Sequence, residues 1–384
     1  MRSVPYVSIV VPCFNTERYI KKSLFSLTHQ TLENIEIVCV NDGSTDETAS
    51  LIMAAAKDDP RIKLISQENG GYGKAVNLGI SNSIGEYIGI LEPDDQMDLF
   101  AYQSLYETAI AYELDICKAD FYKFWENERG DIQARYSKIC SYNDPYSFPV
   151  NVENCADQLL LNSPRGICTG IYRKEFLDRN EVRLHESPGA SYQDNGFYFK
   201  TMLSAKRIMY IKAAYYWYRQ DNPNSSFKCA TNYSAMLEEH SFIEKWLRAD
   251  ESRWSKFKEY YAAIALGNNL FTLSRLRNDL KMSYAKEISR ILLQQKTADS
   301  ITFEKCSVEQ RRLVEDIINN PAGFCRTIPS SEGQKGKTDD QIEVLKAKNR
   351  EYQLALEKIK KSNSWKIGRA LTSLPRAIKK HVKR

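Results

Sequence analysis

Apolar runs and amphipathic stretches alternate along the first hundred residues. Continuous runs rich in β-branched residues predict buried parallel strands at 7–12 (VSIVVP), 35–40 (IEIVCV), 62–65 and 87–91 (YIGIL). Apolar residues at helical spacing predict helices at 17–30 and 47–56, and a third helix that follows the loop at 68–74 and ends at 82. This alternation predicts an α/β fold with a mostly parallel sheet, flanking helices and right-handed crossovers.

The chain changes character after this region and divides into further segments. Residues 100–230 are less regular, and we assign them to the same domain, 1–230. A helical region follows at 231–327, then a polar linker at 328–338, a predicted coiled coil at 339–361 and a basic tail at 362–384.

The predicted coiled coil rests on a heptad seam. Apolar residues and one asparagine recur at alternating spacings of three and four: Ile342, Leu345, Asn349, Tyr352, Leu356 and Ile359. An asparagine at an a position is satisfied best by its own mate, so the seam predicts an in-register homodimer. A solvated helix packed on its own domain is the alternative.

Composition narrows the classes of protein. The 384 residues are 42% apolar with a net charge of +5, which excludes a mostly disordered chain. Ten Lys and Arg, and no acid, lie between 358 and 384, so the rest of the chain is mildly acidic and unsuited to general nucleic-acid binding. There is no signal-peptide pattern and no apolar run of membrane-spanning length, and nine scattered cysteines are typical of reduced thiols. We therefore expect a cytoplasmic protein.

Polar loops follow each predicted strand. They are PCFN (12–15), NDGSTD (41–46), the glycine-rich ENGGYGKAVN (68–77) and LEPDD (91–95). Because the carboxyl ends of parallel strands share one edge of a sheet, these loops are expected to meet at a ligand site. Each motif alone is typical of an ordinary turn or helix cap, and only the ordered set of four motifs indicates a ligand site.

This ordered set closely resembles the family 2 glycosyltransferases, whose fold is the nucleotide-diphosphosugar (GT-A) fold. The resemblance covers residues 5–230 and continues through PGASYQDNGFYFKT (188–201) and YYWYRQDNPNSSF (215–227). It implies an inverting enzyme of bacterial surface polysaccharide synthesis. The donor implied is a UDP-sugar, and the acceptor implied is a lipid-linked glycan.

The resemblance also implies a metal site at LEPDD. Hard cations such as Mn²⁺ or Mg²⁺ prefer oxygen ligands, and a sugar nucleotide brings two phosphates. Asp95 is the expected metal ligand, with Asp94 on the metal or near the ribose. Glu92 stands where the family more often has aspartate, and we do not expect it to contact the metal.

Further residues are expected to bind the nucleotide. By resemblance, Asp42 contacts the base or ribose, and Lys74 reaches the diphosphate unless it is simply solvated. The other residues expected to line the nucleotide site are Pro12, Phe14, Asn15, Glu17 and Gly71. Asn15 has an alternative role as cap of the following helix.

Inversion requires a base that deprotonates the acceptor hydroxyl. The resemblance assigns this role to Asp194 in SYQDNGF, where Gln193 replaces a glutamate that is common in the family. Capping the next helix is the alternative for Asp194. Arg219 is expected to face the leaving diphosphate, or alternatively to hold its own loop.

Two other functions share some of these features. A sugar nucleotidyltransferase has the same fold, but its first strand–helix turn is glycine-rich, whereas PCFNTERY has no glycine. A non-catalytic scaffold would have no reason to keep Asp42, Asp94, Asp95 and Asp194 together. The basic tail, with Trp365, Leu371, Leu374 and Ile378, is expected to bind an anionic membrane surface, and a solvated arm is the alternative.

Overall fold

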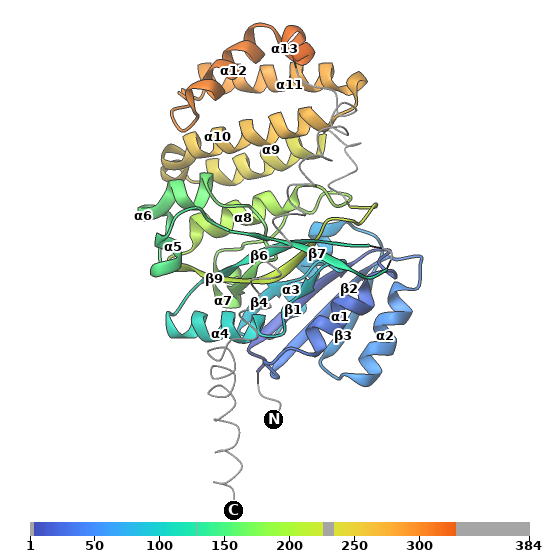
Figure 1. Ribbon diagram of the computed structural model, residues 1–384. Helices are drawn as coiled ribbons and strands as arrows, with labels where there is room; N and C mark the ends of the chain where they lie inside the picture. Colours follow the sequence, from blue (N-terminus) through green and yellow to red (C-terminus); the bar gives the residue numbers. More distant parts are fainter. Residues whose placement is uncertain (1–3, 128, 226–233, 328–384) are drawn as a thin grey trace, which may run out of the picture. The chain divides into compact units, whose positions relative to one another are not determined.

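A computed structural model of the chain describes residues 4–127, 129–225 and 234–327 (Figure 1). The predicted linker (328–338), coiled coil (339–361) and basic tail (362–384) lie outside the described residues. None of the described helices combines the length and apolar character needed to cross a bilayer.

A single sheet runs through the described residues in the order β3-β2-β1-β4-β8-β6-β9-β5, with β7 beside β6. Its first four strands are parallel, as the alternating pattern predicts. These strands are β1 (Val7–Cys13), β2 (Ile35–Asp42), β3 (Ile62–Gln67) and β4 (Tyr87–Ile90). Each lies within two residues of its predicted limits, because continuous apolar runs mark buried parallel strands clearly.

The second half of the sheet mixes directions. β8 pairs antiparallel with β4 and β6, whereas β6 and β9 run parallel. The strands of this half are β5 (Gln96–Met97), β6 (Ile116–Glu126), β7 (Ile132–Ser137), β8 (Gly170–Arg173) and β9 (Ile208–Arg219). Their pairing is long-range, which is why the pattern of residues 100–230 gives no regular alternation.

Helices cover the sheet, and the first three follow the expected order. They are α1 (Ile20–Thr28), α2 (Thr48–Asp58) and α3 (Tyr72–Asn82). The helix expected at 17–30 begins three residues late, because the backbone before it is held by the second loop. The other helices of the catalytic region are α4 (Ala101–Ala111), α5 (Asp144–Ser147), α6 (Val152–Ala156), α7 (Lys174–Arg179) and α8 (Gln193–Ser204), with a π-helical turn at Asp157–Leu161.

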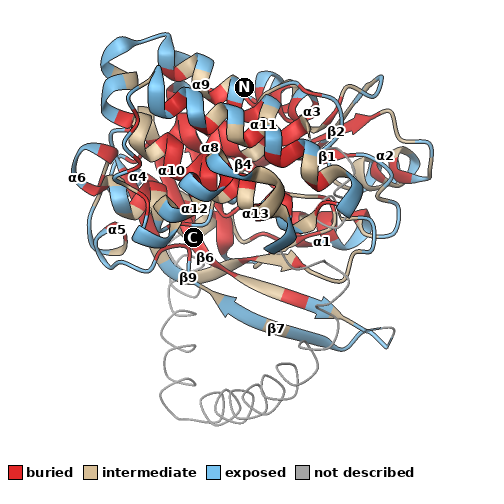
Figure 2. Cartoon of the chain, turned by 90° about the horizontal axis from the view of Figure 1, so that it is seen from above, coloured by how far each residue is buried: buried red, intermediate tan, exposed pale blue. Residues whose placement is uncertain are grey.

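The core lies on the central strands. Every residue of β1 and β2 is buried, and Figure 2 shows buried residues concentrated along these strands and α8. α3 packs directly on β1, since a Cβ at Gly79 would lie 2.3 Å from Cγ1 of Val10. Glycine at this position therefore permits the close approach that places the start of α3 at the edge of the sheet.

Within residues 234–327 the structure describes five helices, with α9 and α10 forming one layer and α11 and α12 another (Figure 1). The backbone N–H of Gly196 in α8 donates to Glu239 of α9 at 2.7 Å, and Asn268 of α10 donates to Asn195 of α8 at 3.2 Å. These bonds attach the helical region to α8. The five are α9 (Ser234–Arg248), α10 (Glu251–Arg275), α11 (Asn278–Thr297), α12 (Val308–Asn319) and α13 (Pro321–Thr327).

Candidate active site

The polar loops meet at the carboxyl edge of the parallel strands. β1, β2 and β4 are hydrogen-bonded neighbours, with Cys13 opposite Asn41 and Val10 opposite Ile90. The chain therefore leaves β1, β2 and β4 at one edge, and there the PCFN, NDGSTD and LEPDD loops begin. This is where ligands bind in open α/β sheets.

The first loop is cross-linked to the second. Asn15, with φ 51°, accepts a hydrogen bond from the backbone N–H of Thr45 at 2.8 Å. Glu17 accepts from the N–H of Glu47 at 2.9 Å. The capping alternative for Asn15 is wrong, because α1 begins at Ile20. Asn15 and Glu17 thus join two loops, and this bonding also delays the start of the helix.

Two further residues of the first loop differ in exposure. Pro12 is buried within β1, opposite Val40. The ring of Phe14 is 49% exposed at the edge of the sheet. An exposed aromatic ring at this edge is free to stack on a nucleotide base, whereas Pro12 can only support the loop from below.

Asp42 organises the glycine-rich loop. One carboxylate oxygen accepts from Gln67 at 2.6 Å and from the N–H of Gly70 at 2.8 Å, and the other accepts from the N–H of Gly71 at 3.0 Å. Gly71 has φ 91°, which favours glycine, and α3 starts at the next residue. The sequence predicts direct contact between Asp42 and the nucleotide, whereas the structure gives its oxygens to the loop. Lys74 is exposed in the first turn of α3.

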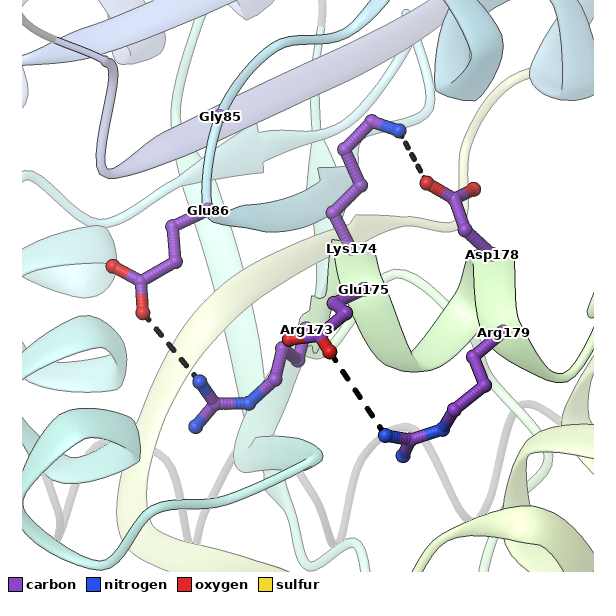
Figure 3. Close-up of a pocket in the computed structure, with 7 residues that line it drawn as sticks. All are labelled: Gly85, Glu86, Arg173, Lys174, Glu175, Asp178 and Arg179. Atoms are coloured by element: carbon purple, nitrogen blue, oxygen red, sulfur yellow. Dashed lines mark hydrogen bonds and ion pairs between the residues drawn. The ribbon is translucent and has the colours of Figure 1, made fainter.

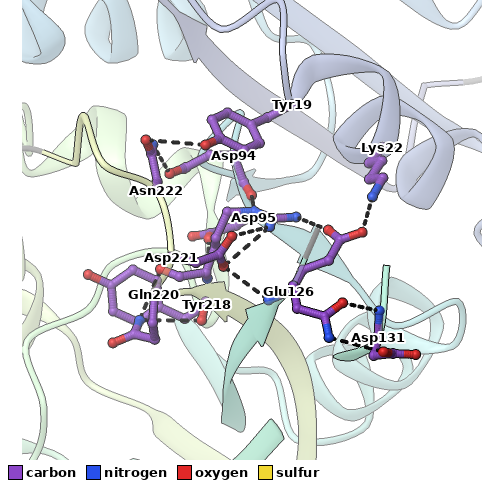
Figure 4. A network of polar contacts seen from close by, with 12 residues as sticks. Tyr19, Lys22, Asp94, Asp95, Glu126, Asp131, Tyr218, Gln220, Asp221 and Asn222 are labelled. Atoms are coloured by element: carbon purple, nitrogen blue, oxygen red, sulfur yellow. Dashed lines mark hydrogen bonds and ion pairs between the residues drawn. The ribbon is translucent and has the colours of Figure 1, made fainter. Parts of the chain in front are cut away.

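Asp94 and Asp95 lie in the loop between β4 and β5, directly before β5. Their surroundings differ (Figure 4). Asp95 is 1% exposed, and its two oxygens accept from the N–H of Arg219 at 2.6 Å and from the hydroxyl of Tyr216. Asp94 is less buried, and Asn222 donates to its Oδ2 at 2.7 Å. The two oxygens of Asp95 anchor β9, and its role as the main metal ligand stays a prediction. Asp94 is the more open of the two carboxylates.

Arg219 is enclosed by its neighbours. Its Nε donates to the carbonyl of Asp94 at 2.9 Å, and its two NH₂ groups bind Glu126 at 3.0 Å and Asp221 at 3.1 Å. Its guanidinium carbon lies 4.6 Å from the ring centre of Phe124. The side chain is 2% exposed, so the contacts favour the loop-holding alternative over a contact with the diphosphate.

The acidic residues fit a metal that arrives with a nucleotide. Within the described ranges, no cluster of three or more His, Cys, Asp or Glu encloses a cation. Mg²⁺ is usually held by one or two carboxylates together with substrate phosphates, so Asp94 suffices on the protein side. Burial raises the pKa of Asp94, and a bound cation would favour its ionised form.

The carboxyl group of Glu92 has different partners from that of Asp94. The hydroxyl of Tyr72 donates to its Oε1 at 2.5 Å, and the thiol of Cys168 lies 3.5 Å from the same oxygen. Burial, together with the nearby charges of Asp94 and Asp194, raises the pKa of Glu92 to about 7. Two carboxyl groups of the LEPDD loop and the distant Asp194 therefore influence one another.

Asp194 lies in the first turn of α8. Tyr192, with φ 72°, precedes the helix as its cap residue, so the capping alternative for Asp194 is wrong. Its carboxylate accepts from Asn195 at 3.1 Å. Burial raises the pKa of Asp194, and the positive charge of Arg165 opposes that shift. Such a carboxylate is suited to proton transfer near neutral pH.

Neither Tyr72 nor Arg165 is predicted from the sequence as a site residue, and Gln193 is noted there only as the replacement of a glutamate. Gln193 donates to the hydroxyl of Ser187 at 3.0 Å and so fixes the loop before α8. Arg165 donates to Asn195 at 3.1 Å from the loop before β8. Tyr72 lies inside the recognised glycine-rich motif and could have been singled out. Arg165 carries no local signal, since only the fold brings it to Asp194.

The comparisons with known proteins agree with this geometry. Residues 8–159 match the family "Glycosyl transferase family 2". The "Uncharacterized glycosyltransferase EpsJ" of Bacillus subtilis (strain 168) is 29% identical over 290 residues, 76% of this chain and 78% of that protein. "Glycosyltransferase GlyA" of Streptococcus pneumoniae serotype 4 is 30% identical over 213 residues, which are 56% of this chain and 30% of that protein.

Solved structures share the fold. S. aureus TarS 1-349 in complex with UDP superposes with a TM-score of 0.63 at 19% identity, over 84% of this chain and 89% of that one. The complex of the same protein with UDP-GlcNAc gives a TM-score of 0.63 at 20% identity, over 84% of this chain and 90% of that one. This likeness confirms the predicted GT-A type of α/β fold.

Proposed function

Because the chain belongs to glycosyl transferase family 2, we propose that it transfers one sugar from a UDP-sugar to a glycan acceptor with inversion. The observation that carries the proposal is the position of Asp194 in the first turn of α8. From there its charge acts on Glu92 of the LEPDD loop. A carboxylate there is separate from the residues that position the nucleotide loops. Asp194 can therefore serve the acceptor while the loops hold the donor.

The proposed reaction is a single displacement. The acceptor hydroxyl gives its proton to the carboxylate of Asp194, and its oxygen forms a bond to the anomeric carbon of the sugar. The bond between that carbon and the phosphate oxygen breaks, and UDP leaves with the electron pair. Burial, which raises the pKa of Asp194, brings this carboxylate closer to the ideal for a base at neutral pH.

The leaving diphosphate carries charge that must be neutralised. When bound, Mn²⁺ or Mg²⁺ would supply that neutralisation as a Lewis acid. We assign Asp94 as the protein ligand and Asp95 as the residue that fixes the strand end through Tyr216 and Arg219. The exposed side chain of Lys74 adds a mobile positive charge near the same loop.

The donor and acceptor are proposed on different grounds. A uridine nucleotide is supported by TarS, a protein of the same fold whose complexes contain UDP and UDP-GlcNAc. A lipid-linked glycan of a bacterial surface polysaccharide is proposed from the sequence motifs alone. Neither the sugar nor the linkage follows from the described residues.

The test is turnover of a panel of UDP-sugars with glycan acceptors, followed by UDP release. Asp194→Asn is nearly isosteric but cannot take up the proton, so turnover should fall about 10²-fold or more. UDP affinity, measured by calorimetry, should stay unchanged in this variant. Asp58→Asn, at an exposed position of α2, is the matched control. Normal turnover of Asp194→Asn would refute the assignment of the base.

A further inference from the structure

Outside the candidate active site, one hollow of about 470 Å³ lies beside β8 and the start of α7 (Figure 3). Its charges neutralise one another. Lys174 pairs with Asp178 at 2.5 Å, and Arg173 pairs with Glu86 at 3.5 Å. The charged side chains of this hollow are already paired with one another, so we infer no ligand for it.

A second hollow lies among the helices that follow residue 233. It is a crevice of about 850 Å³ between α9, α10 and α11, within the size range of small-molecule sites. α9 contributes His240 and Glu244, α10 contributes Tyr261 and Asn269, and Asp299 follows α11. We call it the helical crevice.

Two residues of the helical crevice carry buried polar atoms without partners. His240 is 5% exposed, and neither ring nitrogen has a hydrogen-bond partner among the described residues. Asp299 binds Arg248 at 2.8 Å through one oxygen, while its Oδ2 is buried and unpartnered. An unpaired buried polar group destabilises a fold, so such groups are normally satisfied by water or a ligand.

The unmet bonds specify the chemistry of an occupant. Burial lowers the pKa of His240 to about 3, so its ring is neutral and requires one donor and one acceptor. Asp299 Oδ2 requires a donor. An ammonium group only donates and a phosphate dianion only accepts, so neither satisfies this set. A hydroxyl does both.

Of the other charged side chains of the helical crevice, Glu238 and Lys245 are exposed to solvent, and the rest are paired with one another. Arg248 pairs with Glu244 at 2.7 Å as well as with Asp299, and Arg290 pairs with Glu287 at 2.6 Å. The wall also carries neutral amides and apolar side chains: Asn269, Gln294, Gln295, Leu266 and Ile291. A sugar presents both hydroxyl groups and C–H faces, which match amides and apolar side chains respectively.

We propose that the helical crevice binds a neutral saccharide at a site separate from the sheet edge. His240 lines the helical crevice, and rotation about its Cβ–Cγ bond would turn a ring nitrogen toward the ligand. Asp299 then accepts from a second hydroxyl. The site lies in helices outside the part of the chain that matches the family, and it goes beyond the proposed transfer reaction.

Saturation-transfer NMR on the full chain tests this site, with glucose and N-acetylglucosamine as neutral probes and glucuronate as the charged comparison. At least one neutral sugar should bind, and glucuronate should bind more weakly. His240→Leu removes the hydrogen-bonding nitrogens and should weaken binding about fivefold or more, the equivalent of one lost hydrogen bond. Its midpoint of urea unfolding should not fall, because neither nitrogen has a partner to lose.

Ser241→Trp, at the exposed rim, is the second variant and should abolish binding by filling the entrance without disturbing the core. Absence of binding by both neutral sugars, equal binding of glucuronate, or full binding in both crevice variants would overturn the proposal. UDP affinity reports on the active site separately.

Discussion

The N–H of Gly71 donates a hydrogen bond of 3.0 Å to the carboxylate of Asp42, and this bond links the end of β2 to the start of α3. The same carboxylate receives the N–H of Gly70. Two loops far apart in the sequence are thus held by one side chain. Asp42 shapes the proposed nucleotide site without having to touch the nucleotide.

Asp42→Asn tests this role. The amide keeps one acceptor oxygen but turns an NH₂ group toward the N–H of Gly71, so the bond is lost and two donors face each other. We expect the free energy of unfolding to fall by about 1–3 kcal/mol, and UDP to bind more weakly. Urea unfolding and calorimetry measure these effects. An unchanged unfolding midpoint would mean that the loop is held by other contacts.

Asp94→Ala and Asp95→Ala should separate metal binding from structure. Asp95→Ala leaves the hydroxyl of Tyr216 and the N–H of Arg219 buried and unpaired, so stability should fall by about 2 kcal/mol or more. Asp94→Ala loses only the bond from Asn222 and should cost about 1 kcal/mol. Metal-dependent UDP binding should disappear in Asp94→Ala. If metal-dependent UDP binding survives in Asp94→Ala, or if EDTA has no effect on UDP binding by the wild type, the metal assignment fails.

The acid limb of the pH–rate profile should report on Asp194. A base works only when ionised, so kcat/KM should fall as the pH drops through its pKa. Arg165 opposes the rise in the pKa of Asp194, and Arg165→Met should therefore move this limb to higher pH. Arg165→Lys keeps the charge and should restore the profile.

Glu92 has a pKa of about 7 and could produce a similar limb. Glu92→Gln removes that titration and serves as the comparison for the profile of the Arg165 variants. If the limb vanishes in Glu92→Gln and does not move in Arg165→Met, the titrating group is Glu92 and not Asp194.

Glu239 makes the stability of the fold depend on pH. Burial raises its pKa to about 8, and burial lowers the pKa of its partner His185, 3.1 Å away, so we treat their contact as a neutral hydrogen bond. The folded state binds this proton more tightly than the unfolded state does. Stability should therefore be fully present below the ordinary glutamate pKa and decline as pH rises toward about 8.

Urea unfolding at several pH values measures this dependence. Glu239→Gln keeps an acceptor for the N–H of Gly196 but does not titrate, so it should flatten the decline. Glu238→Gln, the neighbouring position, is the control and should keep the wild-type slope. A wild type whose stability rises over the same interval would contradict the prediction.

The basic tail lies outside the described residues, and its membrane role stays a prediction. With about 1 kcal/mol per basic residue near an anionic surface, half of the ten positive charges between 358 and 384 would hold the protein there. Co-sedimentation with anionic liposomes should fall as salt rises, because the attraction is screened. It should disappear when residues after Lys361 are removed. Equal sedimentation of the truncated chain would leave the tail as a solvated arm.

The sequence by itself determined the parallel half of the sheet and the identity of the loops at its edge. Buried parallel strands are continuous apolar runs, and polar residues such as Asp42 and Asp94 directly follow them. This information is local. Family resemblance then placed Asp194 at the start of a helix, where the structure also has it.

Only the tertiary structure decided which partner each polar group has. Asp95 and Arg219 are 124 residues apart, so no spacing rule could show that the carboxylate accepts from that backbone N–H. The same holds for Arg165 beside Asp194 and for the unpaired nitrogens of His240. Hydrogen bonding and desolvation depend on what surrounds an atom in space, and long-range packing sets those surroundings.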